Sequence, residues 1–381
     1  METAEDIAGD TFLKASEHWA IHGVPENPAA WLYTVAKNKA KDYIKHLSVV
    51  ETRVRSQTET ERIRYEEAFE YHEQSIADSQ LAMIFAVCNP ANASKSQICL
   101  ALQILCGFSV EEIANAFLTK VETIKKRLQR ARSNLRNDHF QVGLLSEAAI
   151  VFRLPTVLKT LYLVFNEGYF SKTGDQLVRK ELCSEAIRLG LVLTENPLTN
   201  TPQVNALMAL MCYQSSRLEA RTGAGNETIR FDDQDRGQWD KALIQRGHHY
   251  LINATTGNEI SAYHLEAGIA YWHTVISDAN KWPHILQLYN QLILIEYSPM
   301  VALNRTFAFA NVYGQEEAIS EAEKLQLTGN NHYHALLGYL YSGTDTAKAL
   351  AHYEQAIRLT RSKPEKQVLS DLKMHCAAQQ R

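Results

Sequence analysis

Helix-start signals between Ser94 and Arg136 constrain the fold of this chain more than any other feature of its sequence. Ser109-Val110-Glu111-Glu112 is a capping box, in which the serine hydroxyl accepts a hydrogen bond from an early backbone N–H and the glutamate accepts one from the cap residue. A helix is therefore predicted from about Val110. Thr119-Lys120-Val121-Glu122 repeats the pattern ten residues later, which leaves the first helix about two turns. This spacing predicts a helix-turn-helix, with a further helix before it.

The second of these predicted helices is strongly basic. Between Thr119 and Arg136 the chain holds seven Lys and Arg residues and one Glu, a net charge of +6, whereas the whole chain carries −4. A local basic helix on an acidic protein is suited to a phosphate backbone. The alternative is a solvated charged face. The apolar stripe that would pack this helix consists of Val121, Ile124, Leu128, Ala131 and Leu135.

Polar residues on the other side of the basic helix are the candidate DNA contacts. Those near its N-terminus are expected to read base edges, and the later arginines are expected to hold phosphates. The candidates are Lys120, Thr123, Lys125, Lys126, Arg127 and Arg130.

Three stretches of this segment, Ile98 to Leu102, Gly107 to Ala114 and Val121 to Arg132, carry a resemblance to a known family. They resemble region 4 of the sigma-70 family, the part that reads the −35 promoter element. The N-terminus resembles region 2 of the same family. Ala4 to Ala15 is similar to the helix that docks on the polymerase clamp, and Asn27 to Tyr43 is similar to the helix that contacts the −10 element.

The resemblance implies a sigma factor whose partners are core RNA polymerase and promoter double-stranded DNA. Family members carry a further helix before the segment that matches Ala4, so region 2 is expected to be incomplete at its N-terminus. The implied −10 contacts are Trp31, Lys37, Asn38 and Lys41, and the implied polymerase contacts are Glu5, Asp6 and Phe12.

From about Gly143 onward the chain shows helical periodicity punctuated by prolines, with no strand-like alternation of any length, so an all-α fold is predicted. His334 to Pro364 resembles a tetratricopeptide (TPR) repeat. Its first helix would hold Gly338 and Tyr341, and its second Ala349, Tyr353 and Ala356. Tyr289, Ala322 and Tyr353 recur at intervals of 33 and 31 residues, which predicts a short solenoid able to bind a protein or peptide.

Two polar motifs are expected to interrupt these helices. Both resemble segments of a subgroup of extracytoplasmic-function (ECF) sigma factors with a long C-terminal extension. Their acids could hold a metal or perform acid–base catalysis. The favoured interpretation is that loop acids cap helices, Arg236 pairs internally and Trp239 is buried, with no metal, cofactor or enzymatic activity. The motif residues are Asn166, Glu167, Asp232, Asp233, Asp235, Arg236 and Trp239.

The predicted domains are region 2 at 1–47, a polar linker at 48–78, region 4 at 79–140 and a TPR-like regulatory domain at 141–381. The acidic C-terminal half is complementary in charge to the basic helix and could hold it until a signal releases it. The alternative function is a TPR-like interaction scaffold with a vestigial DNA-binding half.

The sequence predicts a cytoplasmic protein with buried thiols and no membrane segment. Its N-terminus is acidic, its six cysteines are scattered, and it lacks an apolar run of eighteen residues.

Overall fold

The computed structural model describes residues 2–25, 28, 31–40, 43, 81–117, 119–137, 147–169, 180–221, 223, 229, 231–274, 281–360 and 363–378. Regular structure among these residues is entirely helical, which confirms the all-α prediction. Two compact units contain residues 1–82 and 83–381. The predicted linker at 48–78 lies outside the described residues, and the predicted boundary at 141 stays a prediction.

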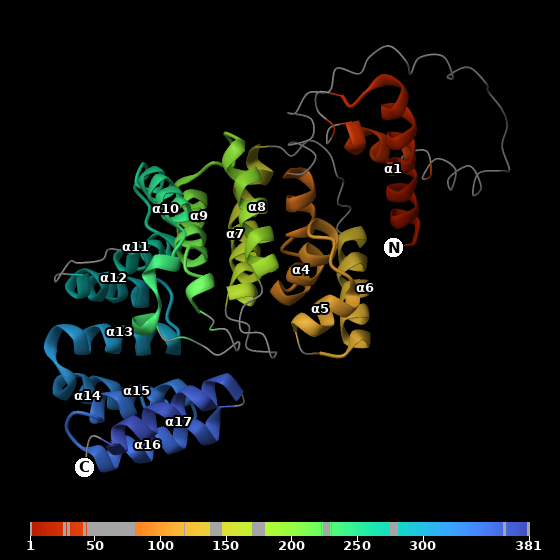
Figure 1. Cartoon of the computed structure of the whole chain (residues 1–381). Coiled ribbons are helices and arrows are strands. Elements are labelled where there is room, and N and C mark those ends of the chain that lie inside the picture. Colours follow the sequence, from red (N-terminus) through yellow and green to blue (C-terminus); the bar gives the residue numbers. More distant parts are fainter. Residues whose placement is uncertain are drawn as a thin grey trace. The chain divides into compact units, whose positions relative to one another are not determined.

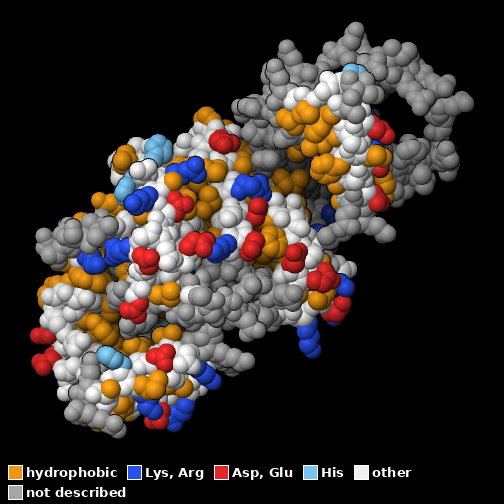
Figure 2. Space-filling view, in the orientation of Figure 1, with side chains coloured by type: hydrophobic (Ala, Val, Ile, Leu, Met, Phe, Trp, Pro, Cys, Tyr) orange, Lys and Arg blue, Asp and Glu red, His pale blue; other side chains and the backbone are white. Residues whose placement is uncertain are grey.

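The first unit is built around α1 (Glu2–His22) and the helical residues 31–40. Ala15 on α1 is buried, and the rings of Trp19 and Trp31 lie 5.5 Å apart. The two segments therefore pack through their aromatic and small side chains. Figure 2 shows apolar side chains on the visible face of this unit as well.

The second unit begins with the predicted helix-turn-helix. After the helical residues 83–87, the chain forms α4 (Ser94–Leu100), which continues as the π-helix η1 (Ala101–Leu105). Then follow α5 (Val110–Ala116) and α6 (Val121–Asn137) (Figure 1). The predicted order of a first helix, a short second helix and a basic third helix is confirmed.

A series of paired helices makes up the rest of this unit (Figure 1). Neighbours along the chain pack against one another, and α9 also packs against α11. The helices are α7 (Glu147–Tyr169), α8 (Lys180–Glu195), α9 (Pro202–Ser215), α10 (Lys241–Ala254), α11 (Ala262–Thr274), α12 (Lys281–Ile295), α13 (Pro299–Tyr313), α14 (Gln315–Lys324), α15 (Asn331–Tyr341), α16 (Thr346–Leu359) and α17 (Lys363–Ala378). Short 3-10 turns η2 (Glu219–Arg221), η3 (Phe231–Asp233) and η4 (Arg236–Gln238) lie between α9 and α10.

Most prolines stand at helix starts, as the sequence indicates. Pro202 and Pro299 open α9 and α13, where the missing N–H of proline costs nothing, and the preceding Thr201 and Ser298 hydroxyls cap the helices. Pro155 is different because it lies inside α7. The prediction that it punctuates the helices was wrong, since burial of the long apolar face of α7 offsets one lost backbone hydrogen bond.

The expected interruption at Asn166 was also wrong. Asn166 to Tyr169 forms the last turn of α7 rather than a loop. Leu161, Val164 and Phe165 precede it on the same helix and are buried, so packing extends the helix through the polar motif. Tertiary burial here outweighs the local polar signal.

The hairpin of α15 and α16 has the close approach that the sequence predicts. A Cβ atom at Gly338 would lie 2.8 Å from the ring of Tyr353, so only glycine fits there. Ala349, Tyr353 and Ala356 on α16 are all buried. The predicted pair of helices is therefore confirmed, while its relation to TPR repeats stays a prediction.

Helix α7 is long and apolar enough to cross a membrane, judged by length and composition alone. Its most apolar window is 44% buried inside this unit, against α8 and its neighbours. A core helix of a helical array has the same composition.

The described cysteines are free and mostly buried, as predicted. Burial raises the pKa of four of their thiols to about 12, namely those of Cys88, Cys106, Cys183 and Cys212.

A buried polar chain links the basic helix to α7. Asn92 Nδ2 donates to the backbone oxygen of Ala131 on α6 at 3.1 Å, and Gln97 Nε2 donates to the backbone oxygen of Asn92 at 2.6 Å. Thr160 Oγ1 on α7 then donates to Gln97 Oε1 at 2.9 Å. Each of these side chains is almost fully buried, so their hydrogen bonds stabilise one arrangement of α4, α6 and α7.

Replacing Thr160 by valine is expected to lower the free energy of unfolding by about 1 kcal/mol, because the buried Gln97 Oε1 loses its donor. The loss is at the low end because the same hydroxyl also bonds the backbone oxygen of Thr156. Urea unfolding followed by circular dichroism measures it. Thr344→Val, at an exposed turn, is the matched control and should change nothing; equal stability of both variants would contradict the buried chain.

Candidate functional site

The capping box that starts α5 is present in the structure. Glu112 N donates to Ser109 Oγ at 3.1 Å, and Ser109 N donates to Glu112 Oε2 at 2.7 Å. These hydrogen bonds hold the pKa of Glu112 below its usual range. The prediction for α5 is therefore confirmed down to its reciprocal bonds.

The second box was wrong in its details. Helix α6 begins at Val121, one residue later than a cap at Thr119 requires, and its first backbone bonds go to the oxygen of Lys120. Glu122 forms an ion pair with Lys125 instead, at 3.2 Å. An acid in the first turn still stabilises the positive end of the helix dipole.

The apolar stripe of α6 packs as predicted, with Ile124, Leu128 and Ala131 fully buried. This packing fixes the opposite face toward solvent. Five of the six candidate DNA contacts are exposed on it, namely Lys120, Thr123, Lys125, Lys126 and Arg130. Arg127 is half-buried and its Nη1 lies 3.8 Å from Cys99 Sγ on α4. The structure thus brings five candidates to one free face and turns Arg127 partly inward.

Sequence reasoning expected the acidic half to be complementary to this basic face. In the described part of the chain, the contacts between the two run elsewhere. Arg188 on α8 donates to the backbone oxygen of Leu105 in η1 at 2.9 Å, and Thr160 reaches Gln97 on α4. The basic face stays exposed, so the helical half supports the helix-turn-helix from behind.

In the first unit, the implied −10 contacts lie on and beside one helical segment. Trp31 is half-buried against His18 and Trp19, Lys37 is exposed and Asn38 is half-buried. Lys41 lies outside the described residues. Lys39, which sequence reasoning did not select, forms an ion pair with Asp10 at 2.9 Å and fixes this segment to α1.

The implied polymerase contacts lie on α1. Asp6 is exposed, and the side chain of Glu5 lies outside the described residues. Phe12 is 64% exposed and its neighbour Leu13 is 59% exposed. Adjacent large apolar side chains in solvent are typical of a protein-binding surface.

One acid of the second polar motif, Asp235, caps a short helix, and so does Asp240 just after the motif. Asp235 Oδ1 accepts from Gly237 N at 2.8 Å, and Asp240 caps α10 by accepting from Leu243 N at 3.0 Å. Asp233 is exposed, and the side chain of Asp232 lies outside the described residues. Within the described ranges, no group of three His, Cys, Asp or Glu residues could hold a metal ion.

The interpretation of Arg236 was wrong in part. Trp239 is buried as predicted, at 5% exposure, but Arg236 forms no ion pair among the described residues. Its guanidinium lies 4.9 Å from the ring centre of Trp239 and 6.0 Å from that of Phe231. Cation–π contacts therefore replace the expected internal salt bridge.

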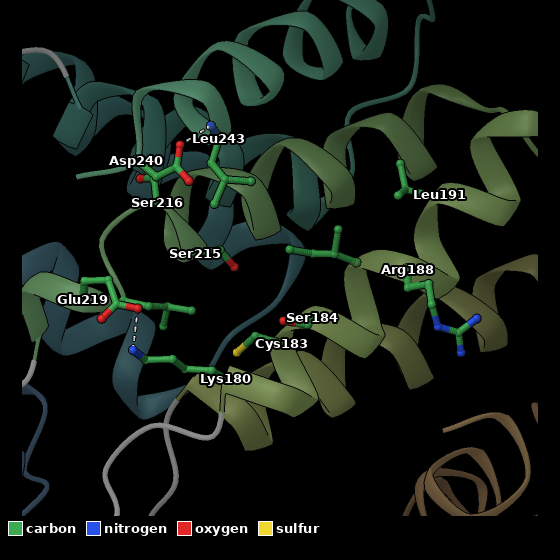
Figure 3. A pocket seen from close by; sticks show the side chains of 12 residues that line it. Lys180, Cys183, Ser184, Arg188, Leu191, Ser215, Ser216, Glu219, Asp240 and Leu243 are labelled. Carbon is green, nitrogen blue, oxygen red and sulfur yellow. Dashed lines mark hydrogen bonds and ion pairs between the residues drawn. The ribbon is translucent and has the colours of Figure 1, made fainter. Parts of the chain in front are cut away.

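A cavity of about 400 Å³ lies between α8, the end of α9 and the start of α10. Figure 3 shows the ion pair of Lys180 with Glu219 at one end and Arg188 at the other. Its walls are mainly apolar, and the buried Ser215 Oγ lacks a hydrogen-bond partner among the described residues. Because Arg188 also bonds Leu105, the cavity adjoins the helix-turn-helix.

Sequence reasoning missed a half-buried carboxyl group, Glu266, between α7 and α11. Tyr162 donates from its hydroxyl to Glu266 Oε1 at 3.1 Å, and Tyr162 and Tyr263 lie 5.5 Å apart. Burial raises the pKa of Glu266 to about 7, against the lowering effect of the Tyr162 hydrogen bond. No sequence motif marks this cluster, because its members are separated by about a hundred residues.

Comparison with known proteins identifies two matched regions. Sigma-70 region 2 matches residues 1–48, and a family of unknown function, DUF6596, matches residues 153–255, which contain the whole lining of the cavity. The chain is 30% identical over 387 residues to the uncharacterized protein R00370 of Rhizobium meliloti, covering 100% of this chain and 91% of that protein. No solved structure matches the chain.

Proposed function

Because the chain belongs to the family of the uncharacterized Rhizobium meliloti protein R00370 and carries a sigma-70 region 2, we propose that it is a sigma factor with its own C-terminal regulatory domain. Region 2 binds core RNA polymerase and the −10 element, and α5 with α6 reads the −35 element. The observation that carries this proposal is the free basic face of α6 on a capped helix-turn-helix.

The exposed surfaces support this division of labour. Phe12 and Leu13 present apolar area for a protein partner, while Lys126 and Arg130 present charge for phosphates. The major groove of DNA admits an α-helix such as α6, whose apolar stripe packs on the protein while its basic face points outward. The protein acts in the cytoplasm, where polymerase and promoter DNA are found, and requires no cofactor or enzymatic activity.

The helical array from α7 onward is the regulatory part. Its α15–α16 hairpin is TPR-like, so it offers a surface for a protein or peptide. Hydrogen bonds from Thr160 to Gln97 and from Arg188 to Leu105 connect this array directly to the helix-turn-helix segment. Deletion of the array would strip α4 of its α7 contact, so point variants test regulation more cleanly than truncation.

Pull-down of purified core RNA polymerase by the full chain, followed by promoter-directed transcription, tests the function. A sigma factor binds the polymerase and gives transcripts from defined start sites. A TPR-like scaffold with a vestigial DNA-binding half would do neither.

Lys126→Ala and Arg130→Ala are each expected to weaken promoter binding and to reduce the slope of log K against log salt by about 0.9, if one phosphate contact is lost. Both side chains are exposed on α6, so folding should be unaffected. Arg358→Ala, exposed on α16, is the control. Titration at several salt concentrations measures the slope; an unchanged slope removes that residue from the interface.

A further inference from the structure

Four side chains from three parts of the chain surround the ring of Phe231. The guanidinium carbons of Arg217 and Arg236 lie 4.7 Å and 6.0 Å from its centre. The rings of His273 and Trp239 lie 4.9 Å and 5.9 Å from it. Arg217 follows α9, Phe231 to Trp239 span η3 and η4, and His273 lies in the last turn of α11. We call these residues, with Lys281 and Trp282 at the start of α12, the Phe231 cluster.

The cluster gathers positive charge without a matching acid in the described part of the chain. Arg217 donates to the Tyr169 hydroxyl at 2.6 Å, and its other contacts are with aromatic rings. Among the described residues, the guanidinium of Arg236 lies against the rings of Phe231 and Trp239, and Lys281 lies 5.4 Å from the ring centre of Trp282. Arg217 and Arg236 both lie against the ring of Phe231, and like charges brought to one ring repel each other, a cost that aromatic faces offset only in part.

Buried polar atoms in the cluster lack hydrogen-bond partners. Among the described residues these are Arg236 Nη1, Trp239 Nε1 and His273 Nδ1. Trp239 is 95% buried, so its N–H cannot be satisfied by bulk water. An unpaired buried donor costs about 1–3 kcal/mol, and such groups in a native protein call for an explanation.

The pKa of the His273 imidazole responds to the charges around it. Burial lowers its pKa first, and Arg217, Lys281 and Arg236 lower it further, to about 3. All three cations therefore act on one point of the structure. No acid counters them there among the described residues.

We propose that the Phe231 cluster binds the phosphate group of a small ligand through Arg217, Arg236 and Lys281. Phosphate offers several acceptor oxygens around one centre, which suits donors arriving from three directions. A carboxylate, with two oxygens in one plane, pairs best with a single arginine. The proposal goes beyond the sigma-factor function and does not depend on it.

The aromatic residues give the ligand a second point of recognition. Trp282 is half-buried and presents a partly open ring beside the cations. A phosphate monoester carrying a planar base can stack on such a ring, whereas inorganic phosphate cannot. The two sources of the phosphate group are therefore distinguishable by affinity.

Isothermal titration of the full chain with inorganic phosphate, with adenosine monophosphate and with ribose 5-phosphate tests the proposal at constant ionic strength. Binding of all three is expected, with adenosine monophosphate tightest if a base stacks and equal affinities if only the phosphate is held. Either result supports the site. Absence of binding by all three, or equal heats with chloride, would overturn it.

Arg236→Met is expected to weaken phosphate binding roughly tenfold or more, because one charged hydrogen-bond donor is lost. Without phosphate the same variant should melt at the same or a higher temperature, since it relieves repulsion. Arg246→Met, exposed on α10, is the matched control and should bind as the unaltered chain does. Loss of binding in both variants would contradict the assignment.

A second readout covers the case in which Arg236→Met fails to fold. Bound phosphate adds negative charge beside His273, so the imidazole pKa should rise by a unit or more in the unaltered chain. Histidine-labelled protein titrated by NMR with and without phosphate shows the shift, and His273→Gln identifies the signal. An unmoved His273 resonance would overturn the proposal.

Discussion

Replacing Glu266 by glutamine is expected to raise the free energy of unfolding at pH 8 by about 2–3 kcal/mol. Burial raises the pKa of this carboxyl from 4.5 to about 7. At pH 8 the folded chain must therefore hold a carboxylate that is poorly solvated, whereas the unfolded chain solvates it fully. Glutamine keeps an oxygen that can accept from the Tyr162 hydroxyl and carries no charge.

The pH dependence has a definite sign. Between about pH 4.5 and pH 7 the folded chain retains a proton on Glu266 that the unfolded chain has released. The stabilising contribution of the protonated carboxyl is thus complete below pH 4.5 and is lost as the pH rises through 7. The variant and the unaltered chain should converge below pH 4.5, separate progressively between about pH 4.5 and pH 7, and differ by a nearly constant amount above that.

Urea unfolding at pH 5, 6, 7 and 8 measures this separation. Glu259→Gln, at an exposed loop position, is the control and should track the unaltered chain at each pH. A constant difference between Glu266→Gln and the unaltered chain across the range would show that burial does not perturb this carboxyl.

Replacing Gly247 by alanine is expected to lower the free energy of unfolding by about 1–3 kcal/mol through overpacking. An added Cβ would lie 2.6 Å and 2.8 Å from two ring carbons of Tyr213. That ring is 1% exposed and is flanked by the rings of His248 and Tyr271 at 5.6 Å and 6.2 Å, so it has little room to move. Helices α9 and α10 would have to separate.

The better helix propensity of alanine, worth about 1 kcal/mol, offsets part of this cost. Gly329→Ala is the matched control, because a Cβ there meets nothing within 4 Å. Equilibrium unfolding in urea distinguishes the two variants. Equal or greater stability of Gly247→Ala would mean that α9 and α10 do not approach as closely as described.

The helix-turn-helix was predictable because its signals are local. A capping box needs residues three apart, and an apolar stripe needs steps of three and four, so Ser109 to Glu112 and the Ile124–Leu128 stripe identify helix starts and faces without knowledge of the rest of the fold. The second predicted capping box placed the start of α6 one residue too early, because the geometry of the turn also determines that the helix begins at Val121.

The structures of the two polar motifs could be predicted less accurately from the sequence than the helix-turn-helix, for a physical reason. Asn166 looks like a loop residue, but apolar packing around Phe165 extends α7 through it. Arg236 looks like half of an ion pair, but the nearest groups are the rings of Phe231 and Trp239. Neither outcome follows from neighbouring residues alone, because both depend on which helices meet.

The sequence by itself determined where the helices of the basic segment begin, which of their faces are apolar and where the positive charge is concentrated, because these properties arise within one or two helical turns. Only the tertiary structure decided that the basic face of α6 stays free and that Asn92, Gln97 and Thr160 join it to α7. It also decided that Tyr162 meets Glu266 and that Arg217 and Arg236 lie against the ring of Phe231. Contacts of this kind join residues far apart in the chain, so their energies depend on how whole helices pack.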